Sequence, residues 1–87
     1  MSAQAHQTLT ELLVLRAQAG YSDAISLLVE AWHDRLLRHA SRLAGRHDDA
    51  RDILQDSWIA IVRGLQGLSD PACFGAWAYQ IVTRRCA

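Results

Sequence analysis

The fold is decided by residues 47–65, HDDARDILQDSWIAIVRGL. From Asp48 to Leu65, apolar residues recur at steps of three and four, which places them on one stripe of a helix. They are Ile53, Leu54, Trp58, Ile61, Val62 and Leu65. A neighbouring stripe repeats at the same steps and consists of Asp49, Asp52, Gln55, Asp56 and Ile59. A solvated face normally mixes both charge signs and lacks a large aliphatic residue, so this second stripe is suited to docking.

The spacing alone leaves a second interpretation of this acidic stripe open. Carboxylates near the start of a helix are stabilised by its dipole. The stripe is therefore also explained as an ordinary solvated helix face.

A first helix is expected ahead of this segment. Thr8 stands three residues before Glu11, the spacing of a capping box, so we expect the helix to begin at Thr8. Residues 1–7 are small and polar and are expected to be disordered. Gly20 is a suitable stop.

Ser22 or Asp23 is expected to cap a second helix, which runs to about Leu43. Its apolar stripe keeps the helical period over several turns, with Ile25, Leu28, Val29, Trp32, Leu36, Ala40 and Leu43. Gly45 is expected to end it, and Asp48 to cap the helix that follows.

The last helix is expected after Asp70 and Pro71, because an aspartate N-cap followed by proline suits a first helical turn. Its apolar side carries Phe74, Trp77, Ala78 and Ile81, with Trp77 as a core anchor rather than a stacking surface. No segment alternates with a period of two, so no strand is expected. The sequence therefore predicts an all-α fold, a compact four-helix domain over residues 1–87. The last helix is expected to be cut short, since no stop signal precedes Ala87.

Composition narrows the class of protein. A chain of 87 residues makes one domain, and nine arginines balance nine acidic residues. Zero net charge argues against a dedicated nucleic-acid coat, but it allows DNA contact by a chain that a larger partner holds in place. Two cysteines are too few for a disulfide framework, and no signal peptide or membrane span is visible. We expect reduced thiols, no membrane contact and a cytoplasmic location.

Catalytic chemistry finds no support in the sequence. His33, His39 and His47 do not combine with Cys73 or Cys86 at any zinc-ligand spacing. There is no glycine-rich phosphate loop and no nucleophile elbow. We expect a protein that is not an enzyme and that has no metal and no cofactor.

Two segments carry a family resemblance. DARDILQDSW (49–58) and FGAWAYQIVTRRC (74–86), in this order, resemble region 2 of the sigma-70 family in its extracytoplasmic-function (ECF) branch. The family patterns are roughly D-A-E-D, two hydrophobic residues and Q-E/D, and then F-R-x-W, two hydrophobic residues and R-I. The resemblance covers the chain from about Leu13 to its end. In the family a linker and a second, helix-turn-helix domain follow, which this chain does not contain.

The resemblance implies a polymerase-binding site. In the family the helix of the first segment docks on a coiled coil of the largest subunit of RNA polymerase. Carried over by position, Asp49, Asp52, Gln55 and Asp56 would make the polar contacts and Ile59 would pack beside them. Arg51 departs from the common Glu of the pattern.

The resemblance also implies a DNA-binding site on the last helix. The family contacts the non-template strand of the promoter minus-ten element there. By position, Gln80, Thr83 and Arg84 would lie nearest the bases, on a face that also holds Ala76 and Ala87, with Arg85 nearer phosphate or in packing. The family often has Asn in place of Arg84. The loop from Gln66 to Cys73 corresponds to one that captures a flipped base, but it has no aromatic or basic residue.

A basic stripe near the end of the second helix has two explanations. Cations there are favourable against the helix dipole, and they could also contact phosphate. The stripe consists of Arg35, Arg38, His39, Arg42 and Arg46.

Together these features predict a sigma factor domain that binds core RNA polymerase and recognises and melts the minus-ten element during bacterial transcription initiation. The alternative is a helical protein-interaction module, which binds polymerase or an anti-sigma factor, or dimerises, without recognising a promoter. A free-standing DNA-binding repressor is excluded, because no basic recognition helix is present.

Overall fold

The computed structural model describes residues 2–86, except for the side chain of His47. Its elements are α1 (Ala3–Gln18), α2 (Ser22–Ala44), α3 (His47–Gly64), the 3-10 turns η1 (Leu65–Gly67) and η2 (Pro71–Cys73), and α4 (Phe74–Cys86). No strand occurs among the described residues, and the predicted all-α fold of four helices is confirmed. The prediction that the last helix is cut short at Ala87 concerns a residue outside the described range.

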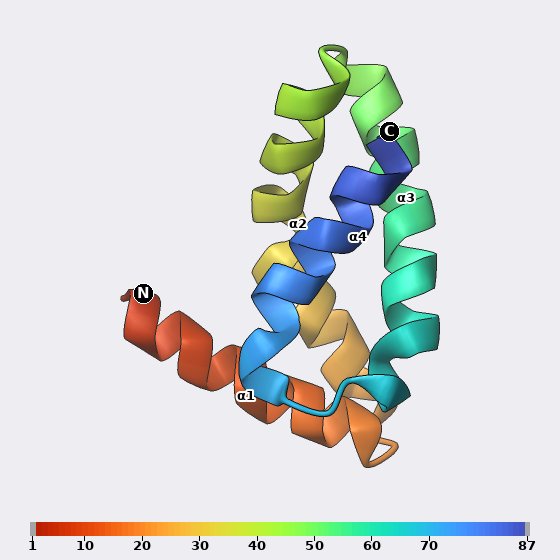
Figure 1. Cartoon of the computed structure of the whole chain (residues 1–87). Coiled ribbons are helices and arrows are strands. Elements are labelled where there is room, and N and C mark those ends of the chain that lie inside the picture. Colours follow the sequence, from red (N-terminus) through yellow and green to blue (C-terminus); the bar gives the residue numbers. More distant parts are fainter. Residues whose placement is uncertain (1, 87) are drawn as a thin grey trace.

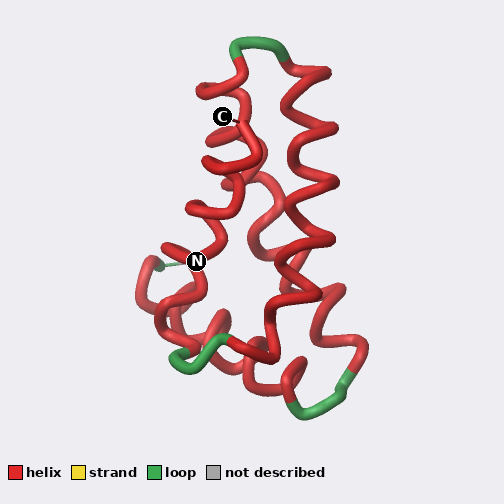
Figure 2. The backbone as a smooth tube through the Cα atoms, turned by 45° about the vertical axis from the view of Figure 1, so that its right-hand side comes forward, coloured by secondary structure: helices red, strands yellow, loops and turns green. Residues whose placement is uncertain are grey.

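The arrangement is built on an α2–α3 hairpin (Figure 1). The two helices run antiparallel from the turn at Gly45, and α4 packs against both of them. α1 crosses the base of the hairpin and packs against α2 and the 65–73 segment (Figure 2). α3 and α4, which carry the two patterned sequence segments, are therefore direct neighbours.

Gly45 ends α2 as the sequence predicts. Its φ of 75° lies in the left-handed region, which glycine adopts without a Cβ clash. Its N–H donates to the carbonyl of Ser41 at 3.0 Å. This C-cap reverses the chain within two residues and sets α3 beside α2.

Apolar residues from all four helices form one core. The largest buried side chains include Leu13 and Val14 of α1, Leu28, Trp32 and Leu36 of α2, Leu54 and Ile61 of α3, and Phe74 and Val82 of α4. Leu43 and Val62 of the predicted apolar stripes lie outside it, since Leu43 is 48% exposed and Val62 is 39% exposed. Leu43 lies in the last turn of α2 and Val62 at the edge of the α3 stripe, where the neighbouring helices do not cover them.

Trp32 joins three helices at the centre of the core. Its indole Nε1 donates to the hydroxyl of Thr10 on α1 at 2.9 Å, and that hydroxyl donates to the carbonyl of His6 at 2.8 Å. The Trp32 ring also packs edge-on against Phe74 of α4 at a centroid distance of 5.6 Å. A Cβ on Gly75 would lie 2.7 Å from this ring, so α4 approaches α2 as closely as it does only because residue 75 has no side chain.

The predicted start of the first helix at Thr8 is wrong. α1 begins at Ala3, and the hydroxyl of Ser2 accepts a hydrogen bond from the N–H of Ala5 at 3.1 Å. Thr8 lies inside the helix and donates its hydroxyl to the carbonyl of Gln4. The extra turn is held by tertiary contact, because buried His6 packs on Trp32 at a centroid distance of 5.0 Å.

The predicted caps of the next two helices are also wrong. α2 has Tyr21 as its N-cap and α3 has Arg46, and neither makes a side-chain cap hydrogen bond. Ser22 is the first residue of α2, and Asp48 lies within the first turn of α3. Packing within the hairpin therefore fixes these starts without the capping bonds that the sequence suggests.

Asp70 caps as predicted, although a 3-10 turn separates it from the helix. Its carboxylate accepts a hydrogen bond from the N–H of Ala72 at 3.0 Å, with Pro71 at the first position. α4 proper begins at Phe74. Trp77 is half-buried and packs edge-on against Phe74, in line with a core anchor.

Within residues 2–86, no helix combines the length and the hydropathy that a bilayer crossing requires.

Candidate functional site

The predicted docking stripe lies on an exposed face of α3. All five of its residues, Asp49, Asp52, Gln55, Asp56 and Ile59, are exposed. Ile59 is an isoleucine with 47% of its surface open to solvent. The core-facing residues Ala50, Leu54 and Ile61 hold the helix in place from the opposite side. We call the five exposed residues Asp49, Asp52, Gln55, Asp56 and Ile59 the acidic ridge.

The carboxylates of the acidic ridge make little use of partners within the molecule. Arg46 approaches Asp49 with a nitrogen–oxygen distance of 4.0 Å, and both side chains are well exposed. Such a pair contributes about 0–1 kcal/mol. No other ion pair within 4.0 Å forms among the side chains that the structure describes. The negative potential of the ridge is therefore available to a basic partner.

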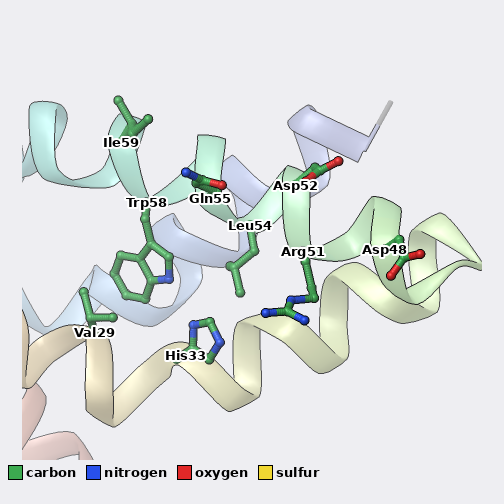
Figure 3. A pocket seen from close by; sticks show the side chains of 9 residues that line it. All are labelled: Val29, His33, Asp48, Arg51, Asp52, Leu54, Gln55, Trp58 and Ile59. Atoms are coloured by element: carbon green, nitrogen blue, oxygen red, sulfur yellow. The ribbon is translucent and has the colours of Figure 1, made fainter.

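A groove lies between α2 and α3, and Asp52, Gln55 and Ile59 of the acidic ridge line one side of it (Figure 3). Its volume is about 780 Å³. Val29 and His33 line it from α2, and Leu54 and Trp58 line it from α3, with Asp52 and Ile59 on the ridge side. The sequence did not predict that α2 lines part of this site. The four-residue spacing of Val29 and His33 puts them on one face, but nothing in the sequence places that face beside Trp58.

Trp58 has an unusual polar atom in this groove. Its indole Nε1 is buried and has no acceptor among the described residues. The buried indole of Trp32, by contrast, donates to Thr10. An unpaired buried donor is uncommon in folded proteins and is often explained by a ligand, a water or a partner.

The second predicted site, on α4, is exposed as well. Gln80, Thr83, Arg84 and Arg85 all lie on the surface. The prediction for Ala87 on the same face lies outside the described residues. The structure therefore leaves these four side chains accessible to a ligand of α4.

Thr83 is held in place by two hydrogen bonds. Its hydroxyl donates to the carbonyl of Tyr79 at 2.9 Å and lies 2.9 Å from Nε2 of His39 on α2. Because the hydroxyl proton goes to Tyr79, Nε2 of His39 carries the proton and donates to Thr83. The His39 ring also packs edge-on against Tyr79 at 4.8 Å. Burial, together with the nearby charge of Arg42, lowers the pKa of His39.

The predicted basic stripe is divided by the structure. His39 links α2 to α4, and Arg35 stacks over the ring of Trp32 at 5.5 Å. Arg46 lies beyond α2, at the N-cap of α3 and beside Asp49. The α2 part of the stripe is thus adjacent to the α4 site, and Arg46 belongs with the acidic ridge.

Glutamines of α1 fasten the 66–73 loop. The side chain of Gln18 donates to the carbonyls of Leu65 and Leu68 at 2.9 and 2.8 Å. Gln7 donates to the carbonyl of Ala72 at 3.1 Å. These bonds set the path of the loop between α3 and α4. Base capture by this loop stays a prediction.

The two cysteines are free thiols in this structure. The carboxylate of Asp70 raises the pKa of Cys73, and burial raises the pKa of Cys86. Both shifts favour the protonated thiol, which is the less reactive form.

A known protein family matches the part of the chain that holds most of α2 and all of α3. The family model for sigma-70 region 2 matches residues 28–87, which is most of the chain. The chain belongs to the sigma-70 region 2 family. The range matched to sigma-70 region 2 holds α2 from Leu28 onward, α3 and α4, whereas α1 and the first turns of α2 precede it.

Two curated relatives of this region 2 domain are ECF sigma factors. It is 38% identical to the ECF RNA polymerase sigma factor SigE of Mycolicibacterium smegmatis over 56 residues, which is 64% of this chain and 21% of that protein. It is 30% identical to the ECF RNA polymerase sigma-E factor of Haemophilus influenzae over 77 residues, 88% of this chain and 40% of that protein. The chain thus spans less than half the length of these relatives. No solved structure matches it.

Proposed function

We propose that this domain acts in bacterial transcription initiation by docking on core RNA polymerase through the acidic ridge. The carboxylates of Asp49, Asp52 and Asp56 and the amide of Gln55 would face basic residues on a coiled coil of the largest subunit. Ile59 would pack beside them. The observation that carries the proposal is the ridge itself, an exposed face that combines acids, an amide and an isoleucine with about half of its surface open to solvent. Complementary charge of this kind speeds encounter and sets orientation.

The α4 face supplies the second half of the proposed function. Gln80, Thr83 and Arg84 would hold unpaired bases of the non-template strand at the minus-ten element, and Arg85 would lie near phosphate. Melting of the promoter then requires no covalent chemistry, because preferential binding to the open strand shifts the equilibrium toward it. Docking supplies the affinity, since a tethered α4 acts at a high local concentration of DNA.

The docking half is tested by reversing charge on the ridge. The double variant Asp52→Arg with Asp56→Arg should abolish pull-down of core RNA polymerase and leave helicity unchanged in circular dichroism. A matched control is Glu30→Arg with Asp34→Arg, which makes the same change in net charge on exposed positions of α2. Unchanged pull-down by the ridge variant would remove the docking half.

The DNA half is tested by removing one cation from α4. Arg84→Ala should weaken retention of a promoter single strand in the complex with polymerase. Arg63→Ala removes the same charge from the exposed last turn of α3 and serves as its control. Equal retention by both variants would contradict the assignment of Arg84.

A second function, protein binding without promoter recognition, is favoured because polar groups near the proposed DNA face are already hydrogen-bonded within the domain. The hydroxyl of Thr83 already bonds His39 and Tyr79, and the loop is fastened to α1 by Gln7 and Gln18. A domain that binds polymerase or an anti-sigma factor without reading a promoter would need no free groups there. Polymerase pull-down without any retention of promoter strand would identify this second function.

A further inference from the structure

Arg51 lies among carboxylates but pairs with none of them. Asp48 and Asp52 line the same groove as Arg51, yet no carboxylate oxygen lies within 4.0 Å of its guanidinium among the described side chains. Figure 3 shows the guanidinium extending across the groove toward His33 of α2, whereas the carboxylate of Asp52 points the opposite way. Arg51 is therefore a cation directed into the groove and unused within the domain.

The same groove holds a second unused donor. The indole Nε1 of Trp58 is buried in the groove wall without an acceptor in the described part of the chain. Figure 3 shows this nitrogen on the side of the ring that faces Leu54 and His33. Because this nitrogen is buried, an entering group reaches it only when neighbouring side chains of the groove shift, and His33 beside it is exposed. A guanidinium and an indole N–H both require oxygen acceptors, and neither can accept a hydrogen bond.

We propose that the α2–α3 groove is a carboxylate-binding subsite. In it, Arg51 and the indole N–H of Trp58 receive the side chain of a glutamate or aspartate from core RNA polymerase. The subsite rests on the proposed docking through the acidic ridge, and it adds a chemical requirement to the partner. The docked segment must carry basic residues opposite the ridge and one acidic residue opposite the groove.

The charges around the groove support a carboxylate over a polyanion. Asp48 and Asp52 flank the groove and repel any anion, and this repulsion grows with each phosphate of a nucleic-acid backbone, whereas a carboxylate carries a single charge. A single carboxylate fits, because the planar guanidinium can bind it through two parallel hydrogen bonds. Such a pair, set between contacts of opposite sign, fixes the register of the partner along α3.

Arg51→Gln distinguishes a partner that presents only basic residues from one that also places a carboxylate in the groove. If the partner presented only basic residues, removing a cation from the surface would strengthen binding. With a carboxylate in the groove, the affinity of the 1–87 chain for the core RNA polymerase of its own bacterium should fall by about ten- to a hundredfold. Arg51→Lys, which keeps the charge and loses the planar fork, should show a smaller loss. Arg63→Gln, on the exposed last turn of α3, should not weaken binding.

Trp58 is tested by replacing it with 3-benzothienylalanine, which keeps the bicyclic shape and lacks the N–H. Binding measured by fluorescence anisotropy should weaken, and helicity should stay unchanged. Unchanged affinity in this variant would overturn the role of Trp58. If Arg51→Gln binds with unchanged or increased affinity, and Asp52→Arg with Asp56→Arg still abolishes docking, the subsite is wrong and the docking stands. If the ridge variant also bound normally, the docking itself would be wrong and the subsite with it.

Discussion

Trp32 and Trp58 both carry an indole N–H shielded from water, but their surroundings differ. The N–H of Trp32 is satisfied by Thr10, and the residue is 5% exposed. The N–H of Trp58 has no acceptor in residues 2–86. The first residue is therefore specified by the needs of the fold, and the second keeps a group that the isolated fold does not use.

Substitution by phenylalanine should separate these two roles. Trp32→Phe should lower the free energy of unfolding by about 1–3 kcal/mol, because the Thr10 hydroxyl loses its donor and part of a central ring is lost. Trp58→Phe should cost less, because it removes no hydrogen bond of the isolated domain. Urea unfolding followed by circular dichroism measures both. Equal losses would contradict the difference between the two residues.

At the scale of elements, α4 is positioned by two close approaches. A Cβ on Gly75 would lie 2.7 Å from the Trp32 ring of α2, and a Cβ on Gly64 of α3 would lie 3.0 Å from the Trp77 ring of α4. The His39–Thr83 hydrogen bond joins α2 and α4 further along. These contacts set the spacing between the acidic ridge on α3 and the proposed DNA face on α4.

Gly75→Ala should destabilise the domain although alanine is the better helix former. The new methyl group meets the buried Trp32 ring, and overpacking costs about 1–3 kcal/mol against about 1 kcal/mol gained in helix propensity. Thermal unfolding should show a lower midpoint. Gly67→Ala is the control, because nothing lies within 4 Å of a Cβ there. A higher midpoint for Gly75→Ala would mean that α4 is free to shift.

The α2–α4 link should also respond to pH. The pKa of His39 lies below its ordinary value of 6.5, first through burial and then through Arg42. The unfolded state therefore binds this proton more readily, and the His39 contribution to stability is lost as the pH falls below 6.5 toward the folded-state pKa. Arg42→Gln should raise the pKa of His39, as measured by NMR titration of its ring. A pKa that stayed the same would exclude Arg42 as a cause.

At the scale of the whole molecule, charges are separated although they sum to zero. Four aspartates lie within the first ten residues of α3, at positions 48, 49, 52 and 56. Arginines gather in the second half of α2 and at the end of α4, at positions 35, 38, 42, 84 and 85. The domain thus offers a negative face on α3 and positive groups on α2 and α4, and neither dominates at long range.

This balance predicts weak binding to free DNA. The isolated chain should bind duplex DNA poorly and with a shallow dependence on salt, because few counterions are released when its net charge is zero. Fluorescence anisotropy at several salt concentrations measures the slope. Tight binding with a steep slope would show that the domain does not depend on polymerase to reach DNA.

Much of the fold could be predicted, because it depends on local signals. The helical periods, the stop at Gly45 and the cap at Asp70 involve residues a few positions apart, and all three are confirmed. The start of α1 could not be predicted, because His6 is ordered by Trp32, a residue of another helix. Likewise, the spacing of residues on α3 alone predicts the exposed ridge, but it cannot predict the groove, which is formed by α2 and α3 together.

By itself the sequence determined which side of each helix is largely apolar, and so that the acidic ridge of α3 and the polar residues of α4 lie on the surface. Only the tertiary structure decided that Val29 and His33 face Trp58 across a groove, that Arg51 extends into it, and that His39 holds Thr83. The physical reason is that periodicity acts within one helix. The meeting of two helices depends on side-chain packing and close approach between residues far apart in the chain.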